Sequence, residues 1–174
     1  MFAAAVGSII VAFVASLWSY SSRSFLTMGN YTDLDAKSRR ALDLMSRDLR
    51  AATDVTAFQK SSTLKSITIS NATAGTQVTY TWSASPRTLV CQKPGQADQT
   101  YLTECDRWDF QLYQRTPQMG GNYVFFPATN SAGDYDLSVC KLINMTWKCT
   151  RTILGDKVNS ESVQTAQVVL RNKR

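Results

Sequence analysis

The chain has 174 residues, of which 44% are hydrophobic, and a formal net charge of +6. This length and composition suit one globular domain with an additional segment, and they argue against a disordered chain. The positive charge is dispersed, with no run of Lys or Arg longer than two residues, so no nucleic-acid partner is expected. Histidine is absent, which removes the commonest general base and the commonest transition-metal ligand.

The first 22 residues carry no charged side chain. Residues 1–20 are mostly Ala, Val, Ile, Phe and Leu, and twenty residues of helix rise about 30 Å, the thickness of a bilayer's hydrocarbon core. Trp18 and Tyr20 lie at the end of this run, where aromatic rings favour the membrane interface. A cleaved signal peptide is the alternative, but no basic residue precedes the apolar run and the aromatic end is a poor cleavage site. The sequence therefore predicts a hydrophobic transmembrane or filament-core helix over residues 1–22.

Small residues recur within this helix at a spacing of four. Such spacing lets apolar helices approach one another closely. We therefore predict that helix packing and assembly involve Ala3, Gly7, Ala12 and Ser16.

Residues 23–58 predict an amphipathic continuation of the helix. No Pro or Gly occurs from Thr32 to Phe58. Either Thr32 or Asp33 caps a new helix, or a single helix runs on from the anchor through Gly29. Three acid-to-base pairs at i,i+4 support helix here, namely Asp33–Lys37, Asp35–Arg39 and Asp43–Arg47. One apolar stripe is expected to pack on the rest of the protein, and it comprises Leu34, Ala41, Met45, Leu49 and Ala52.

Beyond Phe58 the hydrophobic period changes from helical to two. Residues 59–174 are therefore predicted to form a β-rich globular head. Strands are expected at 66–70, 77–82, 87–91, 108–112, 123–126 and 165–170, with one long strand or two within 138–154. The second and third of these flank a hairpin turn at 83–86. We expect an antiparallel sheet packed on the helix, which is an α+β fold.

Four cysteines lie in the predicted head, and none belongs to a C-x-x-C pair. Behind an export-type segment, an even number of cysteines indicates two disulfides. Three connectivities are possible. The shorter loops favour Cys91–Cys105 and Cys140–Cys149.

No sequence motif points to catalysis, to a cofactor or to a metal. The chain lacks a nucleophile elbow, a phosphate-binding loop and a zinc-protease motif. The most closely spaced carboxylates lie on the predicted helix and are matched to Lys or Arg. Asp134 and Asp136 form a D-x-D in a loop, but too few oxygen ligands gather there to favour calcium over a polar turn. We expect no enzymatic activity, catalytic residue, cofactor or metal site.

The order of these parts resembles type IV pilins and type II secretion pseudopilins. Residues 38–52 (SRRALDLMSRDLRAA) look like the amphipathic segment of the minor pseudopilin J family, and residues 165–172 (TAQVVLRN) look like its closing strand. The processing motif of such precursors, a glycine and phenylalanine followed by a glutamate, is absent from the printed sequence. No processing or methylation site is therefore assigned to any residue.

The resemblance implies a structural subunit of a pilus-like or secretion pseudopilus filament. Such a subunit resides in the inner membrane before assembly and in a periplasmic or extracellular filament afterwards. Its implied partners are copies of itself or other pilin-like subunits, an assembly platform and secretion machinery. Two other hypotheses remain open: a membrane-anchored envelope module for binding or adhesion that does not polymerise, and an anchored enzyme.

Overall fold

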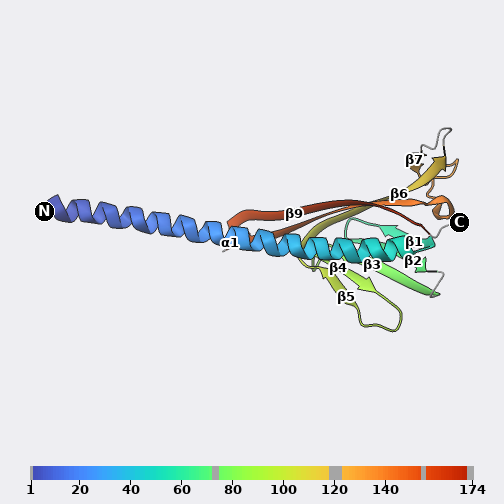
Figure 1. Cartoon of the computed structure of the whole chain (residues 1–174), viewed down its shortest axis with the longest axis horizontal. Coiled ribbons are helices and arrows are strands. Elements are labelled where there is room, and N and C mark those ends of the chain that lie inside the picture. The colour runs from blue at the N-terminus through green and yellow to red at the C-terminus, as the bar shows by residue number, and fades with distance from the viewer. Residues whose placement is uncertain (1, 72–74, 118–122, 154–155, 172–174) are drawn as a thin grey trace.

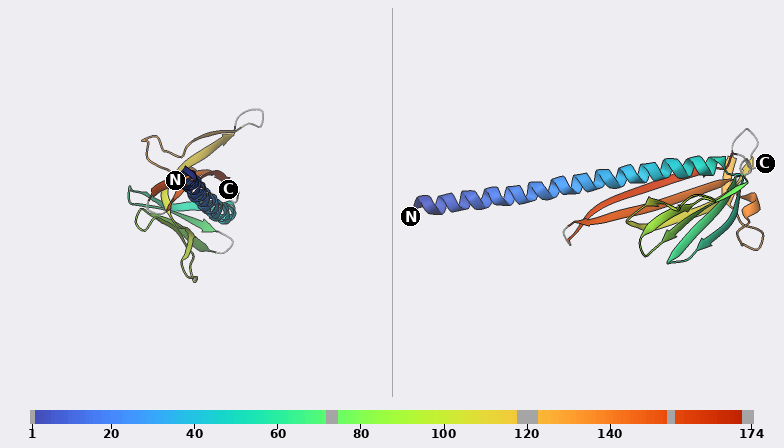
Figure 2. Two further views of the ribbon diagram at one scale, coloured as in Figure 1. Left: turned by 90° about the vertical axis from the view of Figure 1, so that its left-hand side faces the viewer. Right: turned by 90° about the horizontal axis from the view of Figure 1, so that it is seen from below.

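The computed structural model describes residues 2–71, 75–117, 123–153 and 156–171. One long helix, α1 (Phe2–Ala51), packs through its C-terminal half on antiparallel β-sheets, as the predicted α+β class requires. Its N-terminal half protrudes from the head as a free rod (Figures 1 and 2).

The helix is continuous across the join between its apolar and amphipathic parts. Fifty residues of helix are about 75 Å long. Gly29 and Asn30 lie within it, so no new helix begins at Thr32 or Asp33. Ion pairs of 2.9 Å (Lys37–Asp33) and 2.8 Å (Arg39–Asp35) form on its surface as expected. Arg47 Nε instead lies 3.9 Å from Asp48 Oδ1.

The helix ends at Ala51, and the prediction that it reaches Phe58 is wrong. Residues 53–56 are Thr-Asp-Val-Thr, and β-branched side chains lose rotamer freedom in a helix and fit a strand better. The Thr53 amide already donates to the Ser70 carbonyl, at 2.9 Å. The strand β1 (Asp54–Lys60) then pairs with β2 (Leu64–Asn71).

The head contains two antiparallel sheets where one was expected. The five-stranded sheet has the order β1-β2-β3-β4-β5, with β3 (Thr76–Ser83), β4 (Thr88–Gln92) and β5 (Gln99–Leu102). The four-stranded sheet has the order β7-β6-β8-β9, with β6 (Cys105–Pro117), β7 (Tyr123–Pro127), β8 (Leu142–Ile153) and β9 (Asp156–Val169). A short 3-10 helix, η1 (Leu137–Val139), precedes β8. Residues 142–153 thus form one strand, and the final strand is much longer than the predicted 165–170.

The core lies between the two sheets and the helix. Trp108, Phe110 and Leu112 alternate along β6 and are all buried, as the period of two indicates. The Trp82 indole of β3 donates to the Cys105 carbonyl of β6 at 2.9 Å, and the Phe58 and Phe110 rings meet edge to face at 6.4 Å. These contacts join the first sheet to the second.

One face of α1 packs against the head. Every residue of the predicted packing stripe is at most 1% exposed, namely Leu34, Ala41, Met45 and Leu49 on α1 and Ala52 directly after it. Ser38 is buried in the same row. Near the end of the helix, Asp48 accepts a hydrogen bond from the Tyr80 hydroxyl at 2.9 Å and pairs with Lys93 at 2.6 Å. These polar contacts attach the helix to the five-stranded sheet.

Candidate functional site

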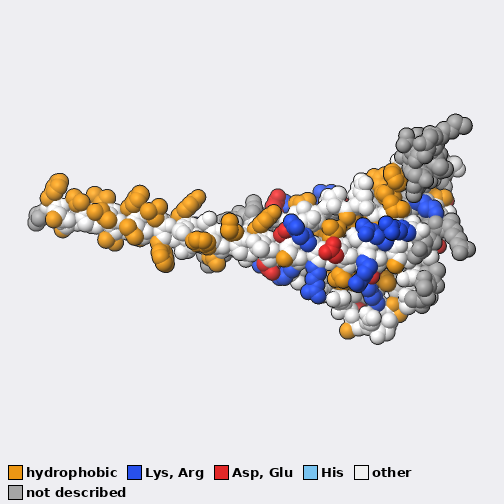
Figure 3. Space-filling model, viewed as in Figure 1, with side chains coloured by type: hydrophobic (Ala, Val, Ile, Leu, Met, Phe, Trp, Pro, Cys, Tyr) orange, Lys and Arg blue, Asp and Glu red, His pale blue; other side chains and the backbone are white. Residues whose placement is uncertain are grey.

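The protruding half of α1 exposes a large apolar surface, which we call the apolar rod (residues 2–31). Figure 3 shows hydrophobic side chains along it, with charged side chains gathering only where the head begins. By length and composition, α1 is long and apolar enough to cross a membrane, and none of its apolar window is buried within the described residues. The exposed large side chains are Phe2, Val6, Ile9, Ile10, Val11, Phe13, Val14, Leu17, Trp18, Tyr20, Phe25, Leu26, Met28 and Tyr31.

The apolar rod is longer than the hydrocarbon core of a bilayer is thick. Residues 2–31 span about 45 Å of helix, against about 30 Å for a hydrocarbon core. Arg23 is the only charged residue among them. Phe25 follows Trp18 by seven residues, two helical turns, so both lie on the same side of the helix. The Phe25 side chain is 73% exposed, although it lies beyond the uncharged stretch.

The small residues predicted to mediate helix packing all lie on the apolar rod and are exposed in the single chain. They are Ala3, Gly7, Ala12 and Ser16. A Cβ added at Gly7 would meet nothing within 4 Å, so this side of the helix is open to a neighbour. The Ser16 hydroxyl donates to the Ala12 carbonyl at 2.9 Å, which satisfies it inside the helix. Their role in assembly stays a prediction.

Where the helix leaves the head, a group of polar side chains fastens it to the second sheet. We call Asn30, Asp33, Glu104 and Arg151 the Arg151 cluster. The Arg151 guanidinium of β8 contacts Glu104 at 2.6 Å, Asp33 at 3.0 Å and the Asn30 amide oxygen at 3.2 Å. Hydrogen bonds from Lys37 and then from Arg151 lower the pKa of Asp33. The cluster thus ties one strand to one turn of the helix.

Two further hydrogen bonds extend this attachment along β9. The Ser160 hydroxyl donates to the Thr27 carbonyl at 3.3 Å, and the Gln164 amide donates to Asp35 at 3.1 Å. Among the described residues, contact between head and helix therefore begins at Thr27, four residues or about 6 Å after Arg23. Sequence analysis did not single out Ser160 or Gln164, because nothing local marks side chains that meet a helix more than a hundred positions away.

We expect Arg151→Met to lower the free energy of unfolding of the head by about 1–2 kcal/mol. The Arg151 side chain is only 22% exposed, so the loss should lie between those of surface and fully buried ion pairs. Urea unfolding followed by tryptophan fluorescence measures it. Arg40→Met, at an exposed position of α1, is the control. Equal stability of the two variants would contradict a structural role for the cluster.

The four cysteines are all buried, but neither predicted pair fits the strands. The Cys105 amide donates to the Arg87 carbonyl, four residues before Cys91 and thus about 13 Å from it along β4. Cys140 precedes β8, while Cys149 lies seven residues, about 23 Å, beyond its first residue. Disulfides require Cα atoms within about 7 Å. The preference for short sequence loops was therefore wrong, because extended strands separate residues that are close in sequence.

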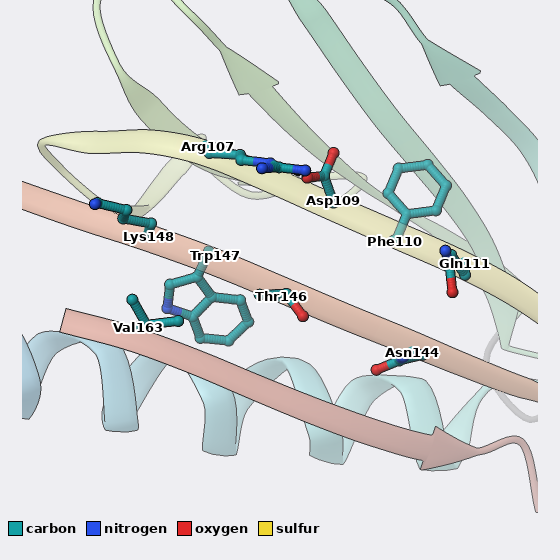
Figure 4. A pocket seen from close by; sticks show the side chains of 9 residues that line it. All are labelled: Arg107, Asp109, Phe110, Gln111, Asn144, Thr146, Trp147, Lys148 and Val163. Atoms are coloured by element: carbon teal, nitrogen blue, oxygen red, sulfur yellow. Dashed lines mark hydrogen bonds and ion pairs between the residues drawn. The ribbon is translucent and has the colours of Figure 1, made fainter.

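A polar groove of about 420 Å³ lies on the outer face of the second sheet (Figure 4). Asp109 within it is bonded to Lys65 and Arg107. Burial raises the pKa of Asp109, but these two hydrogen bonds outweigh burial and lower it overall. Lys148 pairs with Glu161 at 2.5 Å. The charged side chains that line the groove are thus all in ion pairs.

No cluster of metal-ligating side chains occurs among the residues described. Asp136 of the D-x-D caps η1 by accepting from the Ser138 amide at 2.9 Å, which is the role of a polar turn. The groove's polar lining comes from β6 and β8, and it comprises Arg107, Asp109, Gln111, Asn144, Thr146 and Lys148. Asp109 is the acid among these described residues, and it pairs with both Lys65 and Arg107.

Comparison with family models, with curated proteins and with solved structures gave no match for this chain. The arrangement of a long N-terminal helix on antiparallel sheets is compatible with a pilin-like fold.

Proposed function

We propose that the protein is a structural subunit of a type IV pilus-like or secretion pseudopilus filament. In this proposal the apolar rod holds the subunit in the inner membrane before assembly. It then packs against the rods of neighbouring subunits in the filament, while the head forms the outer surface.

The observation that carries the proposal is the extent of the apolar rod. A helix that served only as a tether needs about 20 apolar residues to cross a bilayer. Here exposed apolar side chains continue past Arg23 to Tyr31, where the head already contacts the helix. A hydrocarbon core that covers residues 2–22 leaves Phe25, Leu26 and Met28 outside it. Neighbouring helices would bury them at the level of the head.

The small residues of the rod support the same packing. In lipid there is no hydrophobic force between apolar helices, so association depends on close contact. Ala3 and Gly7 lie one turn apart, as do Ala12 and Ser16, and all four are exposed. They provide surfaces at which a neighbouring rod can approach closely.

The variant Phe25→Asp tests whether the rod packs in a filament or serves only as a membrane anchor. Burying a Phe against a neighbour contributes about 1.5–3 kcal/mol, so its replacement by Asp should lower filament yield at least about tenfold. The measurement is the amount of protein in filaments sheared from producing cells, viewed by negative-stain microscopy. Membrane pelleting should be unchanged, because residues 2–22 are intact.

Phe125→Asp is the matched control, because Phe125 is also exposed but lies on β7 of the head. We expect this variant to retain filaments. If the unmodified protein remains monomeric in membranes and never enters the sheared fraction, the filament proposal fails. An anchored binding module, with the polar groove as its contact surface, would then be favoured.

A further inference from the structure

Cys105 and Cys149 face each other across two neighbouring strands. They are register partners in the antiparallel pair of β6 and β8. The Thr150 amide donates to the Glu104 carbonyl at 3.0 Å, so the bond joins the residue after Cys149 to the residue before Cys105. This pattern defines a non-hydrogen-bonded pair, in which the Cα atoms are about 4.5 Å apart.

The backbone N–H and C=O groups of Cys105 form hydrogen bonds to residues other than Cys149. Its amide donates to the Arg87 carbonyl at 2.8 Å, and its carbonyl accepts from the Trp82 indole at 2.9 Å. Both contacts lie toward the first sheet. They hold Cys105 in place while its side chain meets that of Cys149.

The two thiols are in contact in the interior of the head. Their mutual hydrogen bond raises the pKa of Cys105 and lowers that of Cys149. Both residues are at most 1% exposed, and the Ser38 hydroxyl of α1 lies beside the Cys149 sulfur. Cys91 has different neighbours, because its thiol lies against Tyr101 and Tyr80 and its pKa is raised by burial.

We propose that Cys105 and Cys149 form a cross-strand disulfide when the head folds in contact with a disulfide-exchange oxidant. The expected Cα separation of about 4.5 Å falls within the range of about 4.4–6.8 Å that disulfides adopt. The bond would join β6 to β8 beside the Arg151 cluster, since Glu104 and Arg151 are close neighbours of the pair in sequence. Oxidation in the cell rests on the proposed function, because disulfides persist in exported proteins.

The chemistry needs an oxidant that carries its own disulfide, either a small molecule or a thiol oxidoreductase. One protein thiolate attacks that disulfide, whose S–S bond breaks, and a mixed disulfide forms with loss of one oxidant thiolate. The second protein thiolate then attacks the protein sulfur of the mixed disulfide. The Cys105–Cys149 bond forms and the second oxidant thiolate leaves. Two protons and two electrons pass from the cysteines to the oxidant, which ends as two thiols.

The test is refolding of the reduced full-length chain, in detergent, with oxidised and reduced glutathione. Remaining thiols are then alkylated and the protein is digested for mass spectrometry. Trypsin alone leaves Cys91 and Cys105 on one peptide, because Lys93 precedes a proline. A glutamate-specific protease also cuts after Glu104 and separates them. The expected product is residues 105–107 joined to residues 149–151, lighter by two hydrogen atoms than the sum of the peptides.

The variant with both Cys91→Ser and Cys140→Ser keeps the pair and removes the competing thiols. It should give the same joined peptides. Its melting temperature should also be on the order of 10 °C higher when oxidised than when reduced. Alkylation of both Cys105 and Cys149 in the refolded protein, or a bond from either to another cysteine, would overturn the proposal. Because the oxidant is supplied in vitro, this result is independent of whether filaments form.

Discussion

Deletion of residues 2–22 is expected to move the protein from the membrane pellet to the soluble fraction. These residues form the uncharged part of the apolar rod and are exposed throughout. Insertion of a helix of this length and composition into a bilayer is effectively irreversible, so alkaline extraction should leave the full chain in the pellet. The head should still fold, because its described contacts with the helix begin at Thr27. Fractionation with and without alkali measures the partition.

A single charged residue in the predicted span should weaken membrane retention without abolishing it. Val11→Arg places a cation at the middle of the predicted span, which costs about 2.5–3.5 kcal/mol of insertion free energy. We expect weaker membrane retention than in the full chain but more than in the deletion variant. If the deletion variant still pellets and resists alkaline extraction, the head itself binds the membrane and the anchor interpretation of the rod is wrong.

Leu49→Ala is expected to lower the free energy of unfolding of the head by about 3–5 kcal/mol. Leu49 is 1% exposed in the core, and its truncation removes apolar contacts and leaves a cavity. The measurement is urea unfolding followed by fluorescence in the variant that lacks residues 2–22. That background removes Trp18 and leaves Trp82, Trp108 and Trp147, all of them buried in the head.

Leu26→Ala is the matched substitution on the rod. Leu26 is 51% exposed, so the unfolding free energy should change by no more than about 0.5 kcal/mol. The same variant in the full chain should weaken assembly if a neighbouring rod covers this position. Similar destabilisation by both substitutions would mean that the rod packs on the head in solution, in conflict with its exposure in the single chain.

Much of the fold could be predicted because its signals are local. The change from a period of about 3.6 to a period of 2 separated helix from strands, and the stripe through Leu34 and Met45 identified the packed face. Ser38 was missed because it is polar. Its position, four residues after Leu34 and three before Ala41, places it in that stripe. Periodicity alone would have included it.

The end of the helix and the division of the sheet were not predicted. Alanines and charged residues favour helix up to Ala51. The β-branched residues that follow are only a weak signal for strand, and the absence of Pro and Gly led to the prediction of helix as far as Phe58. The split between β5 and β6 occurs where Glu104 adopts a positive φ of 60°. A non-glycine residue in this conformation has no reliable sequence signal.

Contacts between distant strands were also beyond sequence reasoning. The pairing of Cys105 with Cys149 depends on a register shift between Cys105 and Arg107. A shift of one residue in strand pairing exchanges the two faces of a strand. Loop length therefore could not identify the partner, and the Arg151 cluster depends on the same register.

The continuity of α1 through the Arg151 cluster determines how the head moves with the rod. Gly29, the weakest helix former near the join, lies next to Asn30, which Arg151 contacts, and two residues after Thr27, which Ser160 contacts. Bending at this point would break those contacts, so head and rod should move together as one rigid body. A one-residue change in the depth of the rod then raises the head by about 1.5 Å and rotates it by about 100°. The packing register of the rods would thus set the direction in which each head faces.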